Sequence, residues 1–271
     1  MNPIRTTFFV LLALLCASLG ALPALAEDSS LADIQKRGVL HVAGPTFLPY
    51  IQHLPNGEYV GIDVDILQGF AKEQKLKLEF IDAGWDTTIA GLQTGKWDVV
   101  PVTCVTEKRL ESVDFTIPYF ASGPAVVFAK SNAKIKALDD LNKPSVTFAQ
   151  SIGTWAEPYV KETFPQAQLK GFTGTGQEQL LAEIQSGRAD AMVVDGPVSP
   201  VRIDNAHPDQ FAFLPGKNEV LPGHPCSGAL VVMKGAATLK AALDQHLLEL
   251  KKSGELAAIH ERHMHGLKPT L

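Results

Sequence analysis

The sequence lacks the features that several classes of protein require. It has only 3 cysteines in 271 residues, which excludes a small scaffold held together by disulfides. It has no excess of basic residues, and a formal net charge of −5 argues against nucleic acid or an anionic membrane surface as a partner. No long apolar run follows residue 22, so we expect the rest of the chain to be soluble.

The one long apolar run is at the N-terminus. Arg5 precedes an almost wholly apolar stretch over residues 8–22, and residues 24–26 (Ala-Leu-Ala) place small side chains where a signal peptidase cleaves. This layout is typical of a secretory signal, so we expect residues 1–26 to be removed and the mature chain to be periplasmic. A membrane anchor is the alternative, but the run is short for a bilayer span.

The remaining chain alternates between two kinds of segment. Apolar or alternating runs predict strands at residues 39–43, 76–80, 97–102, 145–149, 191–195 and 229–233. Amphipathic or capped segments predict helices that start near residues 63, 86, 106, 154 and 177, followed by a C-terminal pair over 236–252 and 255–263. Such alternation indicates mostly parallel sheets covered by helices on both faces, with ligands bound at the carboxyl ends of the strands.

Several helix ends carry local signals. Asp63 is expected to cap the helix that follows it, and Thr106 the next short helix. Thr154 and Glu157 have the spacing of a capping box. Gly95 stands where a helix needs a left-handed terminal residue.

A set of ordered fragments carries a family resemblance. The fragments are Phe47-Leu48-Pro49-Tyr50, Gly61-Ile62-Asp63-Val64-Asp65, Trp85-Asp86, Gly95-Lys96-Trp97-Asp98, Thr106-Glu107-Lys108-Arg109, Val113-Asp114-Phe115, Pro118-Tyr119, Gly153-Thr154 and Gly187-Arg188-Ala189-Asp190-Ala191 leading to Asp195. Each is weak alone, but in this order the chain resembles the family 3 periplasmic solute-binding proteins, the polar amino-acid binders of ABC importers.

The resemblance implies a two-lobed, type II periplasmic binding protein fold of the α/β class. Lobe 1 would comprise residues 27–122 and 227–271, and lobe 2 residues 123–226. Two hinge crossings would lie near 121–124 and 225–228, with Gly123 and Gly228 giving them backbone freedom. The family further implies a monomer without cofactor or metal that delivers its ligand to a membrane ABC permease.

The predicted binding site centres on Arg109. Its guanidinium offers paired donors that match a ligand carboxylate, and Thr106 precedes it at the N-cap of the same helix. Asp195 ends a predicted strand in lobe 2 and matches the position that pairs with a ligand ammonium in the family. By the same resemblance, Phe47 and Trp85 flank the ligand side chain.

The other candidate residues include departures from the family pattern. Thr154 and Trp155 open the first helix of lobe 2, where the family often has two hydroxyl residues, and Gln177 begins a later helix. Cys104 stands where many members have Ser or Thr, and Val102 where they have Gly or Ser, so the ammonium site is weaker or differently built.

The predicted ligand is an amino acid or a related small carboxylate. Residues 44–46 (Gly-Pro-Thr) lack the acidic residue that binders of basic amino acids carry there, which disfavours lysine, arginine and ornithine.

Two groups of residues are left with open roles. Cys104 and Cys226 remain after signal removal and either form a disulfide or stay as separate thiols. His260, His263 and His265 cluster near the C-terminus, where a favourable interaction with the helix dipole is preferred over metal binding.

Three functions compete on this fold. A transport receptor is favoured, and a sensor that presents its ligand to a membrane receptor has the same sequence features. The third is an enzyme similar to cyclohexadienyl dehydratase. Residues 142–146 also resemble that branch of the family. Those enzymes carry a glutamate where this chain has Val198, so the general acid for loss of water is missing.

Overall fold

The computed structural model describes residues 28–174, 176–223 and 226–264. The predicted signal peptide, residues 1–26, lies outside the described residues. Within the described part, no helix combines the length and the apolar character needed to cross a bilayer.

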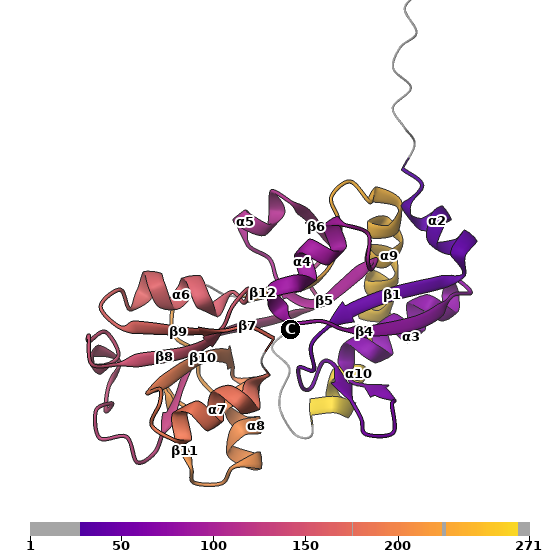
Figure 1. The fold of residues 1–271 in the computed structure, drawn as a ribbon. Helices are drawn as coiled ribbons and strands as arrows, with labels where there is room; N and C mark the ends of the chain where they lie inside the picture. Colours follow the sequence, from indigo (N-terminus) through magenta and orange to yellow (C-terminus); the bar gives the residue numbers. More distant parts are fainter. Residues whose placement is uncertain (1–27, 175, 224–225, 265–271) are drawn as a thin grey trace, which may run out of the picture.

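The chain folds into two α/β lobes (Figure 1). Lobe 1 contains strands β1 (Val39–Gly44), β4 (Lys77–Asp82), β5 (Val99–Cys104), β6 (Val113–Phe115) and β12 (Cys226–Met233), with the small hairpin β2 (Gln52–His53) and β3 (Tyr59–Val60). Its helices are α2 (Ser30–Arg37), α3 (Ile62–Glu73), α4 (Trp85–Gln93), α5 (Glu107–Leu110), α9 (Ala237–Ser253) and α10 (Glu255–Met264). Strands β1, β4 and β5 pair in parallel, as the alternation of elements predicts.

Lobe 2 repeats the scheme. Its strands are β7 (Phe120–Ala129), β8 (Thr147–Ser151), β9 (Gln168–Phe172), β10 (Ala191–Gly196) and β11 (Phe211–Leu214). Its helices are α6 (Ala156–Thr163), α7 (Gln177–Gln185) and α8 (Val198–Ala206), with a short 3₁₀ turn η1 (Leu138–Asp140). Strands β8, β9 and β10 pair in parallel, while β7 runs antiparallel to β10.

Strands β7 and β12 connect the two lobes. Residues 120–122 of β7 pair with residues 226–228 of β12, and residues 123–128 of the same strand pair with β10. The overall strand order is therefore β4-β1-β5-β12-β7-β10-β8-β9. The carboxyl ends of β5 and β10, which carry Cys104 and Asp195, face the region between the lobes.

Gly123 and Gly228 do not serve the hinges through backbone freedom, as was predicted. Neither Gly123 nor Gly228 has a positive φ, so backbone freedom is not what the position requires. A Cβ on Gly228 would lie 1.8 Å from the ring of Phe120, and one on Gly123 would lie 2.9 Å from the side chain of Val220. Both glycines are needed because neighbouring side chains pack directly on the backbone.

Most predicted elements occur within about two residues of their expected bounds. The strand predicted over 97–102 begins later, at Val99, and the helix predicted at Asp86 begins at Trp85. The expected cap at Asp63 is wrong, because helix α3 starts at Ile62 after Gly61, and Gly61 has φ 138°. Asp63 is instead fully buried inside the first turn.

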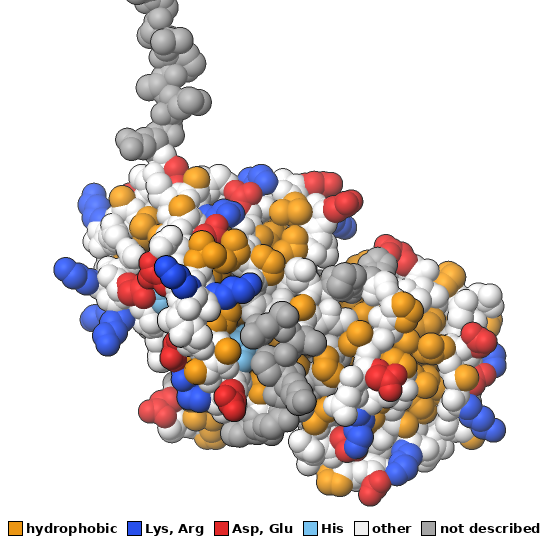
Figure 2. All heavy atoms as spheres, turned by 180° about the vertical axis from the view of Figure 1, so that it is seen from behind, with side chains coloured by type: hydrophobic (Ala, Val, Ile, Leu, Met, Phe, Trp, Pro, Cys, Tyr) orange, Lys and Arg blue, Asp and Glu red, His pale blue; other side chains and the backbone are white. Residues whose placement is uncertain are grey.

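Each lobe has its own apolar core. In lobe 1 the core lies beneath α3, α9 and α10 and includes Phe70, Leu230 and Leu243. In lobe 2 it lies on both faces of the sheet and includes Phe148 and Met192. On the face drawn in Figure 2, acidic and basic side chains are interspersed over both lobes, which matches the modest net charge.

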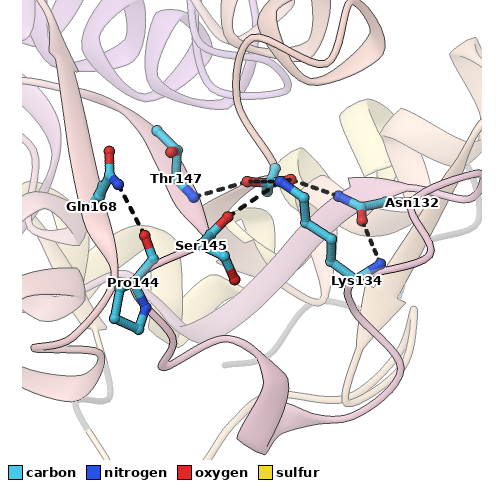
Figure 3. Close-up of polar contacts among 7 residues, drawn as sticks. Asn132, Lys134, Pro144, Ser145, Thr147 and Gln168 are labelled. Atoms are coloured by element: carbon cyan, nitrogen blue, oxygen red, sulfur yellow. Dashed lines mark hydrogen bonds and ion pairs between the residues drawn. The ribbon is translucent and has the colours of Figure 1, made fainter.

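The chain segment before β8 is held by a buried carboxylate at the far side of lobe 2. Asp190 accepts hydrogen bonds from the Lys134 ammonium at 2.9 Å and from the backbone N–H of Thr147 at 3.0 Å. Lys134 also donates to the carbonyl of Ser145, and Gln168 to that of Pro144 (Figure 3). The segment that resembles the dehydratase branch is therefore part of this structural network.

Candidate functional site

A cavity of about 80 Å³ lies between the lobes. A single water occupies roughly 10–15 Å³ on this measure, so the space holds a small ligand. Its lining includes eight of the residues predicted from the sequence: Phe47, Trp85, Cys104, Arg109, Thr154, Trp155, Gln177 and Asp195. Both lobes contribute to this inner cavity.

Thr106 is the predicted site residue that does not line the inner cavity. It faces a wider outer groove of about 860 Å³ between α5 and α6, beside Glu107 and Lys108. Its hydroxyl accepts a hydrogen bond from the backbone N–H of Arg109 at 3.3 Å, as the expected N-cap does. Thr106 therefore supports the short helix that carries Arg109.

Arg109 spans the gap between the lobes. Its guanidinium donates through Nη1 to the carbonyl of Cys104 and through Nη2 to the carbonyl of Gly153 in lobe 2, both at 2.8 Å. Burial lowers the pKa of Arg109 to about 10, and the nearby Asp195 carboxylate acts in the opposite direction. The group is therefore a cation at neutral pH, with guanidinium N–H donors beyond the two used here.

Asp195 is a half-buried carboxylate at the end of β10. Its Oδ1 accepts hydrogen bonds from the Ser122 hydroxyl at 2.8 Å and from the Trp155 indole N–H at 3.0 Å. Burial raises the pKa of Asp195, while these two hydrogen bonds and the charge of Arg109 lower it. The cavity thus brings a guanidinium and a carboxyl group together, the two kinds of group that match the ends of an amino acid.

Aromatic rings form one wall of the cavity. Phe47 and Trp85 meet edge to face with centroids 5.9 Å apart, and Phe47 stacks on Tyr50 at 5.8 Å. Trp155 contacts Tyr159 edge to face at 5.8 Å and packs against the cores of both lobes. These rings fix the shape of the cavity with little side-chain freedom.

The predicted capping box at the start of α6 is wrong. The helix begins at Ala156, so Thr154 lies in the preceding turn and donates its hydroxyl proton to the carbonyl of Ser151 at 2.8 Å. Glu157 accepts from the backbone N–H of Gly153 at 3.1 Å. Gln177 is the first residue of α7, as predicted.

A disulfide joins Cys104 to Cys226, with 5.1 Å between their Cα atoms. Strands β5 and β12 pair at this point, which brings together two residues 122 positions apart in the sequence. A carboxylate oxygen of Asp195 lies within 4.8 Å of both sulfur atoms.

Two further features of the site were not predicted: the contact of Ser122 with Asp195 and the backbone conformation of Val102. Ser122 holds Asp195, but its place opposite Cys226 is determined only by the pairing of β7 with β12. Val102 lines the cavity with φ 47°, which is unusual for a β-branched residue, and its N–H donates to the Tyr119 hydroxyl at 3.0 Å. The only sign in the sequence of an unusual backbone at this position was that the family has Gly or Ser where this chain has Val102.

The C-terminal histidines make protein contacts. Nε2 of His263 lies 2.9 Å from a carboxylate oxygen of Asp65, and His260 is buried in lobe 1. His265 lies outside the described residues. Burial lowers the pKa of His260 to about 4, so this imidazole is neutral at pH 7.

Comparisons with known proteins agree with this geometry. Residues 40–266 match the model of the bacterial extracellular solute-binding proteins, family 3. The probable amino-acid-binding protein YxeM of Bacillus subtilis is 29% identical over 92% of this chain and 93% of its own length. The cyclohexadienyl dehydratase of Pseudomonas aeruginosa is 25% identical over 75% of this chain and 76% of its own.

A solved structure has a similar fold and a higher sequence identity. The ancestral amino-acid-binding protein AncCDT-1, a precursor of cyclohexadienyl dehydratase, superposes with a TM-score of 0.76 at 33% identity, covering 87% of this chain and 99% of its own. The chain therefore belongs to the family 3 bacterial extracellular solute-binding proteins, with the type II periplasmic binding protein fold.

Proposed function

We propose that this protein is the extracytoplasmic receptor of an ABC importer and closes around an amino acid or a similar small carboxylate. The observation that carries the proposal is the inner cavity, where Arg109 of lobe 1 and Asp195 of lobe 2 both contribute to the lining. A ligand that touches both groups favours the closed arrangement of the lobes, because only that arrangement provides both contacts.

Each anchor has a defined part in this binding. The remaining N–H donors of Arg109 match the two oxygens of a ligand carboxylate. Asp195 uses Oδ1 for Ser122 and Trp155, so Oδ2 is placed to accept from a ligand ammonium. Phe47 and Trp85 contact the ligand side chain, and Thr154, Trp155, Cys104 and Gln177 complete the enclosure.

The lining also indicates which amino acids fit. Among the described residues that line the inner cavity, Asp195 is the one acidic group. A basic ligand needs a second carboxylate for its side chain, so lysine, arginine and ornithine are disfavoured.

The family supports an extracytoplasmic setting, within which we propose the following details. Residues 1–26 act as a cleaved signal, and the mature monomer works in the periplasm with a membrane permease as its partner. The lobe boundaries that we propose are residues 27–122 with 227–271 for lobe 1 and 123–226 for lobe 2.

Dehydratase activity is the alternative, and it is supported by the similarity to cyclohexadienyl dehydratase. Val198, where those enzymes carry glutamate, begins helix α8 and is buried. A valine cannot donate a proton to a leaving hydroxyl, so the alternative needs another acid.

A thermal-shift screen of the refolded mature protein against amino acids, small carboxylates and prephenate tests the proposal. A ligand at a hundred times its dissociation constant adds about 2.7 kcal/mol of stability. We expect at least one amino acid or small carboxylate to raise the Tm, and Arg109→Ala to abolish the shift. The matched control, Arg202→Ala, removes a half-buried cation outside the cavity lining and should retain it.

No shift by any compound would contradict the proposal. Prephenate turnover, measured in the same samples, would establish the alternative instead.

A further inference from the structure

The disulfide lies at the one place where both ligand anchors converge. Cys104 ends β5 in lobe 1, and Cys226 begins the connecting strand β12. Neither residue is among those that the proposed function uses to hold a charged ligand group. Their position nevertheless connects them to Arg109 on one side and to Asp195 on the other.

The link to Arg109 runs through the backbone of Cys104. The carbonyl of Cys104 accepts from Nη1 of Arg109 at 2.8 Å. The direction of the guanidinium therefore depends on where the end of β5 lies. The disulfide fixes that end to β12 covalently, in addition to the pairing of Cys104 with Gly228.

The link to Asp195 runs through Cys226. Strand pairing places Cys226 directly opposite Ser122, and the Ser122 hydroxyl donates to Oδ1 of Asp195 at 2.8 Å. The same oxygen accepts the indole N–H of Trp155 at 3.0 Å. A carboxylate oxygen of Asp195 also lies within 4.8 Å of both sulfurs.

We propose that Cys226 is a positioning residue, which through its disulfide to Cys104 holds Arg109 and Asp195 in register for the ligand. This rests on the proposed function of those two groups as anchors. A dithiol that reduces the bond transfers two electrons and two protons, so the S–S bond breaks, two S–H groups form and the dithiol becomes a disulfide. Each new S–H is a weak donor beside Asp195 and competes with Ser122 and Trp155.

As a consequence, the geometry of the binding site depends on whether the Cys104–Cys226 disulfide is oxidised or reduced. In the oxidised protein the sulfurs have no proton to donate, so Asp195 keeps its two donors. In the reduced protein the ends of β5 and β12 separate and both links relax. Cys226 lines the outer groove, which is the side from which a small dithiol reaches the bond.

The test uses the indole N–H signals of the ¹⁵N-labelled protein and needs no ligand. The sequence has 3 tryptophans, and Trp155→Phe assigns the signal of interest. Trp97 is the internal control, because its indole donates to the carbonyl of Thr88 at 2.8 Å within the core of lobe 1. We expect dithiothreitol to move the Trp155 signal upfield and to speed its hydrogen exchange, while the Trp97 signal stays in place.

Two variants keep the test decisive. The pair Cys104→Ala and Cys226→Ala should show the reduced Trp155 signal without dithiol and should not respond to it. Ser122→Ala leaves the disulfide intact but removes the hydroxyl that holds Asp195, so it should change the Trp155 signal without any dithiol. An unchanged Trp155 signal on reduction would overturn the proposal.

Equal changes at Trp155 and Trp97 would also overturn it, because they would show general loosening. Because no ligand takes part in this experiment, a negative result would overturn the role of the disulfide without bearing on the proposed function, which the thermal-shift screen tests separately.

Discussion

The cleft and the interior of lobe 1 both bury ionisable side chains, but they treat them differently. In the cleft, Asp195 has two hydrogen-bond donors and the charge of Arg109 nearby. Behind the cleft, no described group lies within full hydrogen-bond geometry of either carboxylate oxygen of Asp63, and the Tyr119 hydroxyl is the polar group that acts on it. Burial raises the pKa of Asp63 to about 8, and the Tyr119 hydroxyl opposes this effect.

The comparison separates binding from stability. Burial raises the pKa of Asp195 as well, but in the cleft two hydrogen bonds and the charge of Arg109 oppose that effect, and the same carboxylate lines the cavity where a ligand cation would lie. At Asp63 burial dominates, so the group is protonated at pH 7 and contributes to the fold as a neutral side chain. Substitutions in the two regions should therefore affect different measurements.

The largest expected effect is that of Asp63→Asn on the pH dependence of stability. The pKa of about 8 lies above the ordinary value of 3.8, so the folded protein holds this proton more tightly than the unfolded chain. The associated stability is complete below pH 4 and is lost as the pH rises to about 8. Asn cannot ionise, so the variant should lose less stability over this range, by several kcal/mol.

Urea unfolding at pH 5 and pH 8 measures this difference. Asp65→Asn is the matched control, because Asp65 lies on the same helix and has the same side chain, but it is half-buried and contacts Arg262 and His263. If stability changed between pH 5 and pH 8 by the same amount in the wild-type protein and in Asp63→Asn, the assignment of Asp63 as a neutral group would be contradicted.

Gly153→Ala should weaken ligand binding in addition to straining the backbone. Gly153 has φ 84°, and a Cβ there would lie 2.8 Å from the Trp85 carbonyl oxygen and from Cα of Asp86 in the other lobe. This clash exists only when the lobes are closed, so ligand affinity should fall by about tenfold to a hundredfold, or about 1.4–2.8 kcal/mol. Isothermal titration calorimetry measures the change.

Gly187→Ala provides the control for backbone strain. Gly187 also has a positive φ, of 71°, but a Cβ there would meet no atom within 4 Å. This variant should lose stability without losing affinity. Equal losses of affinity in both variants would show that strain, and not lobe closure, is responsible.

A smaller effect is expected for Trp155→Phe. The change keeps an aromatic ring but removes the N–H that donates to Asp195, so affinity should fall by less than about tenfold. Trp97→Phe removes a comparable indole hydrogen bond far from the cavity and should lower the Tm only. Fluorescence titration of both variants checks the prediction. The prediction fails if Trp97→Phe weakens ligand binding as much as Trp155→Phe does.

The sequence predicted the framework and eight of the residues that line the cavity. Apolar runs and helix ends located the strands and helices, and the ordered family fragments located Arg109, Asp195 and the aromatic wall. These are properties of single segments, or of spacings along one chain. They remain valid in the folded protein because the parallel strands of each lobe, β1, β4 and β5 or β8, β9 and β10, end at one edge of the sheet.

The parts that the sequence did not predict depend on pairing between distant strands. Ser122 reaches Asp195 only because β7 pairs with both β10 and β12. The Cys104–Cys226 bond requires the register of β5 with β12. The caps at Asp63 and Thr154 failed because the helix starts were displaced by one or two residues, which is enough to turn a capping side chain inward.

The central claim is that one ligand binds to both lobes through Arg109 and Asp195. Its most direct test is the dissociation constant, by calorimetry, of the compound with the largest thermal shift for wild type, Arg109→Lys and Asp195→Asn. The account predicts that Asp195→Asn weakens binding by about 2–5 kcal/mol, because it leaves the ligand ammonium without a charged partner. Arg109→Lys should also weaken binding, because a lysine ammonium keeps the charge but loses the paired guanidinium hydrogen bonds. A dissociation constant unchanged in either variant would contradict it.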